Sequence, residues 1–253
     1  MLSIIIPALN EENYIFDCLK SILKLDGLSN FSYEVIVIDN GSTDRTKDVV
    51  KEKFPNVKVV SELRKGVTIA RNRGGFEAAG EILVFFDADV MAPWDWLKRA
   101  SNILNNNSEI VAISGPYVYD GLNFFQCLLV KFFYYFFANA GEILFSDLLK
   151  KGGIMQGGNI AVRADVFKRV GGFDETVSFW GDETMLARKL IKFGKIKFLQ
   201  SLWVKSSARR LKKEGLIRTG CRGIMNCAWP IFFGRPFTKN YNDIREDVIN
   251  KKH

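Results

Sequence analysis

The 253-residue sequence predicts an α/β fold in which helices flank a mostly parallel central sheet. Two observations carry this prediction. Short runs of β-branched and other apolar residues alternate with helix-like segments through residues 1–90. Polar clusters directly follow three of these runs, and open α/β sheets bind their ligands at the carboxyl ends of strands. The 47% hydrophobic and 25% charged residues are typical of a globular protein and exclude intrinsic disorder.

The first half alternates predicted strands and helices. Each strand is a continuous apolar run, as expected when both faces of a strand are buried. Ile15, Cys18 and Ile22 recur at helical spacing after the first strand. Ser42 or Thr43 can cap the second helix. We expect strands at residues 2–7, 33–38, 57–61 and 81–86, and the second and third helices at residues 44–54 and 68–79.

The second half is less regular. A pair of strand elements at residues 110–119 is followed by a Phe- and Tyr-rich segment, residues 122–140, that favours a helix. Pro230 and Pro236 limit any helix in the apolar and basic segment 216–233. We also expect a short strand at residues 159–162 and helices at residues 164–170 and 182–193.

One domain is expected at residues 1–215, with a regular first half (1–115) and a mixed second half (116–215). Residues 216–253 form a basic and apolar C-terminal extension.

Residue usage excludes several kinds of chemistry. The single His is His253, so neither a Ser-His-Asp hydrolase nor a His-rich metal site is expected. Residues 186–253 carry 17 Lys and Arg against 4 Asp and Glu, whereas residues 1–185 carry 19 against 24. This basic quarter indicates an anionic partner, for which nucleic acid, anionic lipid and a nucleotide diphosphate all qualify.

No apolar stretch reaches the roughly 18 residues that a membrane-spanning helix needs, and the N-terminus lacks a signal-peptide pattern. We therefore expect a cytoplasmic protein. The basic quarter and the Phe-rich segment are candidates for peripheral contact with an anionic membrane surface. Core packing or a homodimer interface is the alternative interpretation of the Phe-rich segment.

Asp87-Ala88-Asp89 directly follows the fourth predicted strand. Two carboxylates at positions i and i+2 can face one ligand if the strand bends there. Hard oxygen ligands suit Mg²⁺ or Mn²⁺, which often bridge a protein carboxylate and substrate phosphates. A turn with solvated Asp side chains is the alternative for this tripeptide alone.

Five ordered sequence blocks extend the Asp-Ala-Asp motif. They read SIIIPALNEENYI, EVIVIDNGSTDRT, RKGVTIARNRG with EILVFFDAD, QGGNIAVRADVFKRVGGFDE, and GDETMLARKL. In this order and at this spacing they resemble family-2 glycosyltransferases with the GT-A fold, over residues 2–194. The resemblance implies that residues 1–215 are the catalytic domain, with 1–115 as its nucleotide-binding half and 116–215 as its acceptor-binding half. The resemblance implies inverting, metal-dependent transfer of a sugar from a nucleotide-diphosphate donor of the UDP or GDP type. The acceptor would be a hydroxyl on a glycan, a lipid-linked molecule or another compound, as in synthesis of polysaccharides, glycolipids or cell-surface glycans.

The resemblance also assigns roles to individual residues. Asn40 stands where the family commonly has Asp, which leaves the identity of the base open. Asp89 would ligate Mn²⁺ or Mg²⁺ with Asp87 beside it; because the chain offers no nearby His, the diphosphate would complete much of the metal shell. The nucleotide-binding residues implied are Pro7, Ala8, Leu9, Asn10, Glu11, Asp39, Asn40, Lys65, Gly66, Arg71, Asp87 and Ala88.

Asp182-Glu183 matches the acidic pair that supplies the catalytic base, with the common Glu-Asp order reversed. Either residue could be the base; we favour Asp182, which could instead serve as a helix N-cap. Arg209 and Arg210 could clamp the diphosphate, with a solvated basic loop as the alternative. Gly157, Gly158, Asn159 and Trp180 are expected beside the donor sugar and acceptor.

Two other function classes remain as alternatives. A sugar nucleotidyltransferase would need a Gly-rich basic loop after the first strand, where this chain has PALNE. A non-catalytic nucleotide- or glycan-binding module would not need acidic residues at both places. Nucleic acid is not an expected partner, since it would leave both acidic pairs unexplained.

Overall fold

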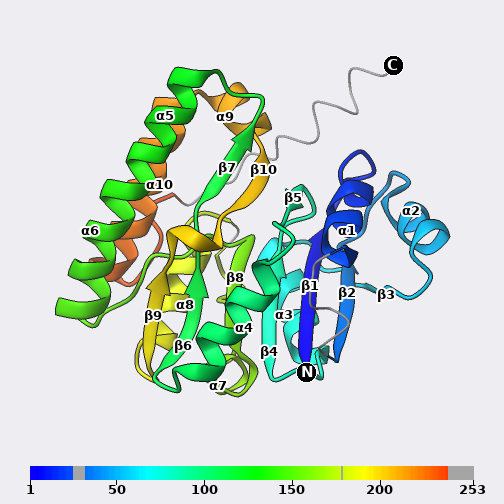
Figure 1. The fold of residues 1–253 in the computed structure, drawn as a ribbon, viewed down its shortest axis with the longest axis horizontal. Helices are drawn as coiled ribbons and strands as arrows, with labels where there is room; N and C mark the ends of the chain where they lie inside the picture. The colour runs from blue at the N-terminus through cyan, green and yellow to red at the C-terminus, as the bar shows by residue number, and fades with distance from the viewer. Residues whose placement is uncertain (25–31, 178, 239–253) are drawn as a thin grey trace.

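A computed structural model describes residues 1–24, 32–177 and 179–238 (Figure 1). His253 and the end of the C-terminal extension lie outside these residues. The centre of the fold is a seven-stranded sheet with the order β3-β2-β1-β4-β8-β6-β9. Neighbouring strands from β3 to β4 run parallel, whereas β8 is antiparallel to both β4 and β6. The predicted α/β class with a mixed second half is confirmed.

The first half follows the predicted alternation closely. Each of the strands β1 and β4 is buried along its whole length, which explains their continuous apolar sequences. The elements are β1 Leu2–Ala8, α1 Ile15–Leu23, β2 Tyr33–Asp39, α2 Thr46–Lys53, β3 Lys58–Ser61, α3 Val67–Glu77 and β4 Ile82–Phe86.

The second half contains elements that the sequence did not reveal. A separate three-stranded sheet, with the order β5-β10-β7, stands beyond the end of the main sheet (Figure 1). The elements are β5 Val90–Met91, α4 Trp96–Asn106, β6 Ile110–Ser114, β7 Tyr117–Asp120, α5 Phe124–Phe133, α6 Asn139–Gly141, β8 Asn159–Arg163, α7 Ala164–Arg169, α8 Asp182–Leu190, β9 Lys195–Phe198, β10 Val204–Ser207, α9 Arg209–Glu214 and α10 Leu216–Phe233.

The core lies on both faces of the main sheet. One cluster packs Ile4, Ile6 and Trp96 beneath α1 and α4, and a second packs Phe85 and Phe167 beneath α3, α7 and α8. The sheet is thereby held rigidly between two layers, which fixes the positions of the loops at its carboxyl end.

The predicted cap of α2 is wrong. The helix begins after Arg45, which makes no side-chain cap hydrogen bond. Ser42 Oγ instead accepts a hydrogen bond from Asn10 N at 3.1 Å, and Thr43 Oγ1 donates to Asn10 Oδ1 at 3.3 Å. Both polar side chains therefore tie the loop after β2 to the loop after β1, in which Asn10 adopts a left-handed φ of 54°.

The Phe-rich segment forms a longer helix than predicted. From Phe124 to Leu148 the backbone is helical over 25 residues, because π-helical turns at Tyr134–Ala138 and Glu142–Leu148 continue α5 through α6. We call it the aromatic helix. The expectation that no segment could span a membrane is therefore wrong for this helix, which is long and apolar enough by length and composition. Such a helix can equally belong to a soluble protein.

The expectation that proline would limit a helix at residues 216–233 is also wrong. Helix α10 runs through Pro230, which lies in its last turn. Only one intrahelical hydrogen bond is lost there, and Pro230 O still accepts from Gly234 N at 2.9 Å. Burial of Pro230 and Ile231 compensates, since Ile231 packs with Tyr134 and Phe198 in a third apolar cluster.

Candidate active site

A cavity of about 920 Å³ opens at the carboxyl ends of β1 and β4. The parallel register aligns Ala8 with Asp39 at the ends of β1 and β2, so the loops after these strands meet at one edge. Helix α3, the start of α8 and the start of α9 complete the polar end of this cavity. The predicted residues that line it are Pro7, Ala8, Leu9, Glu11, Asn40, Lys65, Gly66, Arg71, Asp87, Ala88, Asp89, Gly157, Trp180, Asp182, Glu183, Arg209 and Arg210.

Arg71 joins the two acidic motifs. Its Nη2 lies 2.8 Å from Asp87 Oδ1 and its Nη1 lies 2.5 Å from Asp182 Oδ2, while only 4% of the side chain is exposed. Burial lowers the pKa of Arg71, but Asp87 and Asp182 more than offset this, so its pKa is raised overall. The permanently charged guanidinium of Arg71 on α3 thus binds two carboxylates that are far apart in the sequence.

The glycine pair before β8 allows this close packing. A Cβ atom on Gly157 would lie 2.8 Å from the Arg71 guanidinium nitrogens, and one on Gly158 would overlap the Asp87 carboxylate. Gly158 N donates to Tyr117 Oη at 2.8 Å, which fixes the loop against β7. The glycines therefore let the backbone approach the charged residues, in addition to any contact with a sugar.

Arg209 binds the second Asp of the motif and the loop after β1. Its guanidinium donates to both oxygens of Glu11, at 2.8 and 2.6 Å, and lies 3.2 Å from Asp89 Oδ2. The guanidinium carbon also lies 4.7 Å from the centroid of the Tyr14 ring. One cation thus faces two carboxylates.

The surroundings of Asp89 suit a divalent cation. Burial raises the pKa of Asp89 to about 7; Arg209 opposes this rise, and the carboxylates of Asp87 and Glu11 add to it. A hard cation here would relieve the clustering of negative charge. Within residues 1–24, 32–177 and 179–238, no group of three or more metal-binding side chains gathers. The residues present fit an ion that takes further ligands from phosphate and water.

Asp182 and Glu183 have different environments at the start of α8. Gly181, with φ of 85°, is the N-cap residue, so the expectation that Asp182 caps the helix is wrong. Both residues line the cavity, but Asp182 is buried and bonded to Arg71, whereas Glu183 is half-buried. Burial, with Asp182 as a second cause, raises the pKa of Glu183 well above its ordinary range.

Several predicted residues have side chains that hold the loops. Asn40 Nδ2 donates to Glu62 O at 2.9 Å and Arg64 O at 2.7 Å, and Asn40 Oδ1 accepts from Gly66 N at 2.9 Å. Asn40 in place of Asp thus shapes the loop that carries Lys65 and Gly66.

Four predicted residues do not line the cavity. Asp39 Oδ1 accepts from Ser42 N at 3.1 Å, and the Asn159 amide donates to Gly115 O and Leu202 O. The residues that do not line the cavity are Asn10, Asp39, Gly158 and Asn159.

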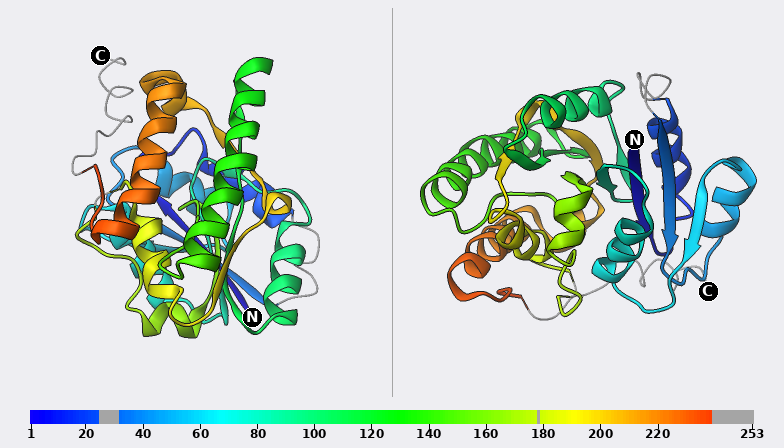
Figure 2. Two further views of the ribbon diagram at one scale, coloured as in Figure 1. Left: turned by 90° about the vertical axis from the view of Figure 1, so that its left-hand side faces the viewer. Right: turned by 90° about the horizontal axis from the view of Figure 1, so that it is seen from below.

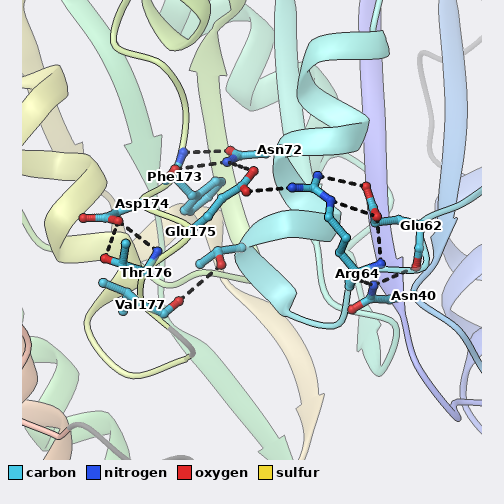
Figure 3. Close-up of polar contacts among 10 residues, drawn as sticks. Asn40, Glu62, Arg64, Asn72, Phe173, Asp174, Glu175, Thr176 and Val177 are labelled. Carbon is cyan, nitrogen blue, oxygen red and sulfur yellow. Dashed lines mark hydrogen bonds and ion pairs between the residues drawn. The ribbon is translucent and has the colours of Figure 1, made fainter.

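A network of polar contacts connects α3 to the loop before α8 (Figure 3). Asn72 donates to Phe173 O at 3.0 Å and accepts from Phe173 N at 2.8 Å. Arg64 bridges Glu62 and Glu175, with N–O distances of 3.2 and 3.1 Å. These contacts fix the segment that delivers Asp182 to Arg71.

Sequence reasoning missed Tyr117 and Tyr119, which line the cavity from β7. Burial, with Asp87 as a second cause, raises the pKa of Tyr117 well above its ordinary value. The alternation Tyr-Val-Tyr was the available signal, since it places both rings on one face of a strand.

Comparison with solved structures defines the class of fold. A mannosyltransferase from Pyrobaculum calidifontis, solved with GDP-Man and Mn²⁺, superposes with a TM-score of 0.64 at 24% identity, covering 88% of this chain and 64% of that one. Glucosyl-3-phosphoglycerate synthase from Mycobacterium tuberculosis, solved with Mn²⁺, UDP and phosphoglyceric acid, gives 0.58 at 20% identity, with 92% and 78% covered. The fold is therefore the GT-A glycosyltransferase fold.

The family assignment comes from the sequence itself. Residues 3–171 match the family described as glycosyl transferase family 2, and the chain belongs to this family. Glycosyltransferase AglE of Haloferax volcanii is 28% identical over 71% of this chain and 58% of its own length. The dolichol-phosphate mannosyltransferase of Pyrococcus furiosus is 35% identical over 47% of this chain and 34% of its own length. The chain thus matches only a third to three fifths of these relatives.

Proposed function

We propose that this protein transfers a sugar from a nucleotide-diphosphate donor to an acceptor hydroxyl with inversion of configuration. The observation that carries the proposal is the buried Arg71, which holds Asp87 of the donor-side motif and Asp182 of the base-side motif in one cluster. The cluster brings the two acidic motifs beside the same cavity, which supports the proposal because transfer between two bound substrates requires their binding groups to lie close together.

Glu183 is the base that the geometry favours. Asp182 is already engaged by Arg71 in an ion pair and is buried, so its carboxylate serves to orient the cluster. Glu183 faces the cavity, and its raised pKa makes it a stronger proton acceptor than an ordinary carboxylate. It takes the proton as the acceptor oxygen attacks the anomeric carbon from the face opposite the leaving nucleoside diphosphate.

The leaving group requires positive charge. Asp89, with Asp87 beside it, would hold Mn²⁺ or Mg²⁺, which would neutralise charge on the diphosphate. Arg209 lies next to Asp89, so it can exchange its contact with Asp89 for a diphosphate oxygen. Arg210 stacks over Phe179 with 4.6 Å between its guanidinium carbon and the ring centroid, at the same wall of the cavity.

The donor is of the UDP or GDP type, as in the two solved structures with bound nucleotide. Two relatives are named for reactions of dolichyl or dolichol phosphate, from Methanococcus voltae and Pyrococcus furiosus. A lipid-linked acceptor fits these names, and we propose a lipid-linked or glycan acceptor at the cytoplasmic face of a membrane.

The test is a panel of UDP- and GDP-sugars incubated with the protein and Mn²⁺, with release of nucleoside diphosphate as the readout. The proposal expects release from at least one donor, and loss of it in Asp89→Asn. Binding of nucleotides without release from any donor, with acceptors supplied, would indicate a binding module. Exchange of pyrophosphate into the nucleotide sugar would indicate a nucleotidyltransferase instead.

A further inference from the structure

The cavity extends far beyond the carboxylates into a space between the aromatic helix and α10. Its walls there are apolar and come from Phe133, Phe137 and Leu144 on one side and Ile224 and Ala228 on the other. The two helices stand side by side in Figure 2. A nucleotide sugar is polar throughout, so the donor does not account for this part of the cavity.

The outer surfaces of the same two helices are also apolar. Phe124 and Phe125 at the start of the aromatic helix are 76% and 77% exposed, and Ile217 at the start of α10 is 76% exposed. Large exposed apolar side chains gathered at one end of a molecule mark an interaction surface.

Basic residues surround this apolar end. Lys212, Lys213 and Arg218 are exposed on α9 and the first turns of α10. Lys212 reaches the turn before the aromatic helix, since a Cβ atom on Gly121 would lie 2.6 Å from Lys212 Nζ. Helix α9 and the start of α5 lie together in Figure 1. Apolar side chains with Lys and Arg around them are typical of a surface that rests on anionic lipid.

We propose that the acceptor hydroxyl is carried by an anionic lipid, whose hydrocarbon chain lies in the apolar part of the cavity. The inference rests on the proposed function. It commits to a lipid because one cavity joins the apolar walls from the two helices to the carboxylates, where Arg209 and Arg210 also line it. The lipid phosphate lies near Arg210, and the hydroxyl of the headgroup reaches Glu183.

The sugar transfer proceeds as proposed above, with the hydroxyl of the lipid headgroup as the acceptor. The hydroxyl oxygen forms a bond to the anomeric carbon, and the hydroxyl proton moves to Glu183. The bond from that carbon to the diphosphate oxygen breaks, and the nucleoside diphosphate leaves with the electron pair.

Two glycines of α10 provide a direct way to fill the passage. Gly220 and Gly223 both line the cavity, and a Cβ atom at either position would meet nothing within 4 Å. Gly223→Phe therefore starts a large side chain from a Cβ position with no neighbour, on a residue that lines the passage, and it removes a helix-interior glycine, which favours folding. Met225→Phe is the matched control, because Met225 is on the same helix, is 37% exposed and does not line the cavity.

The experiment is titration calorimetry of the full chain with dodecyl phosphate, below its micelle concentration, and with butyl phosphate. Each methylene that is fully buried strengthens binding by about fourfold. The proposal expects dodecyl phosphate to bind at least about 100-fold more tightly than butyl phosphate to the parent protein and to Met225→Phe. In Gly223→Phe this preference falls at least about tenfold. Gly220→Phe repeats the test one turn away.

Equal affinity for the two phosphates, or a preference that Gly223→Phe leaves intact, would overturn the lipid inference. Either result leaves the proposed function standing if nucleotide sugars are still cleaved and a water-soluble glycan accepts the sugar. Absence of cleavage of any nucleotide sugar, with dodecyl phosphate bound as expected, would instead contradict the proposed function alone. Concentration-dependent dimerisation that blocks dodecyl phosphate would assign the apolar surface to a second copy of the chain and overturn the inference.

Discussion

At the residue scale, Arg71 is the centre of the account. It is 3% exposed and lies between two carboxylates that would otherwise repel each other in a buried setting. Replacement by Met leaves both acids without a partner. Removing one member of a buried ion pair costs about 3–5 kcal/mol of unfolding free energy. We expect Arg71→Met to show a loss of this size in urea unfolding.

Arg73→Met is the control, because Arg73 is on the same helix but 47% of its side chain is exposed, in a pair with Glu77. The unfolding free energy of Arg73→Met should fall by no more than about 0.5 kcal/mol, as for other surface pairs. Similar losses in the two variants would show that the Arg71 cluster contributes no special stability.

The raised pKa of Glu183 predicts a pH dependence with a definite sign. A base works only when deprotonated, so kcat/KM should rise with pH through a pKa above the ordinary glutamate range. The folded state also holds this proton more tightly than the unfolded chain, so stability should fall as pH rises above about 4.5, the unperturbed value.

Glu183→Gln should flatten this fall in stability, as measured by unfolding at a series of pH values. An unchanged stability profile in Glu183→Gln would contradict the assignment of the raised pKa to this residue.

Individual residues of the site differ in whether the sequence alone predicted them. Asp87, Asp89, Asp182 and Glu183 were predicted because they lie in short motifs beside predicted strands and helices. Their partners could not be predicted, since Arg71 and Asp182 are 111 positions apart and Arg209 and Glu11 are 198 apart. Such pairings depend on the packing of α3 and α9, which local pattern does not specify.

At the element scale, the loop of residues 152–158 packs closely against the charged cluster. Gly158→Ala would drive a methyl group into the Asp87 carboxylate, so we expect kcat/KM to fall at least about tenfold, in keeping with displacement of a positioned group. Gly152→Ala is the control in the same loop, because its Cβ would make only ordinary contacts at 3.4–3.5 Å. Equal activity of the two variants would show that the close approach at Gly158 is dispensable.

Elements differ in how well sequence predicts them. Strands β1 and β4 are wholly buried, and their continuous apolar runs are unambiguous. The pair of strand elements predicted at residues 110–119 corresponds to β6 and β7. Strand β10, in contrast, is four residues long and partly exposed, and it pairs with β7 across more than 80 positions. Neither length nor pattern identifies such a strand. Helix α10 continues through Pro230 because its last turn is buried against other elements. That burial depends on tertiary packing, so the local sequence does not predict it.

At the scale of the whole molecule, metal and nucleotide should stabilise the protein jointly. Asp89 offers few protein ligands to a cation, so most of the shell must come from the diphosphate. We expect Mn²⁺ with UDP or GDP to raise Tm by more than the sum of the two separate increases. A ligand at 100 times its Kd contributes about 2.7 kcal/mol, or a shift on the order of 5–10 °C for a chain of this size.

Asp89→Asn should abolish the joint part of this increase, while Asp165→Asn, on the exposed surface of α7, should retain it. A joint increase that survives in Asp89→Asn would place the metal elsewhere.

We propose that Glu183 takes the acceptor proton in the sugar transfer. The most direct measurement compares single-turnover transfer by the parent protein and Glu183→Gln, with nucleoside diphosphate binding measured on the same samples. A general base contributes about 10²–10⁴-fold to rate, so we predict a loss of at least about 100-fold with nucleotide affinity unchanged within about threefold. Transfer by Glu183→Gln within about threefold of the parent rate would contradict the account.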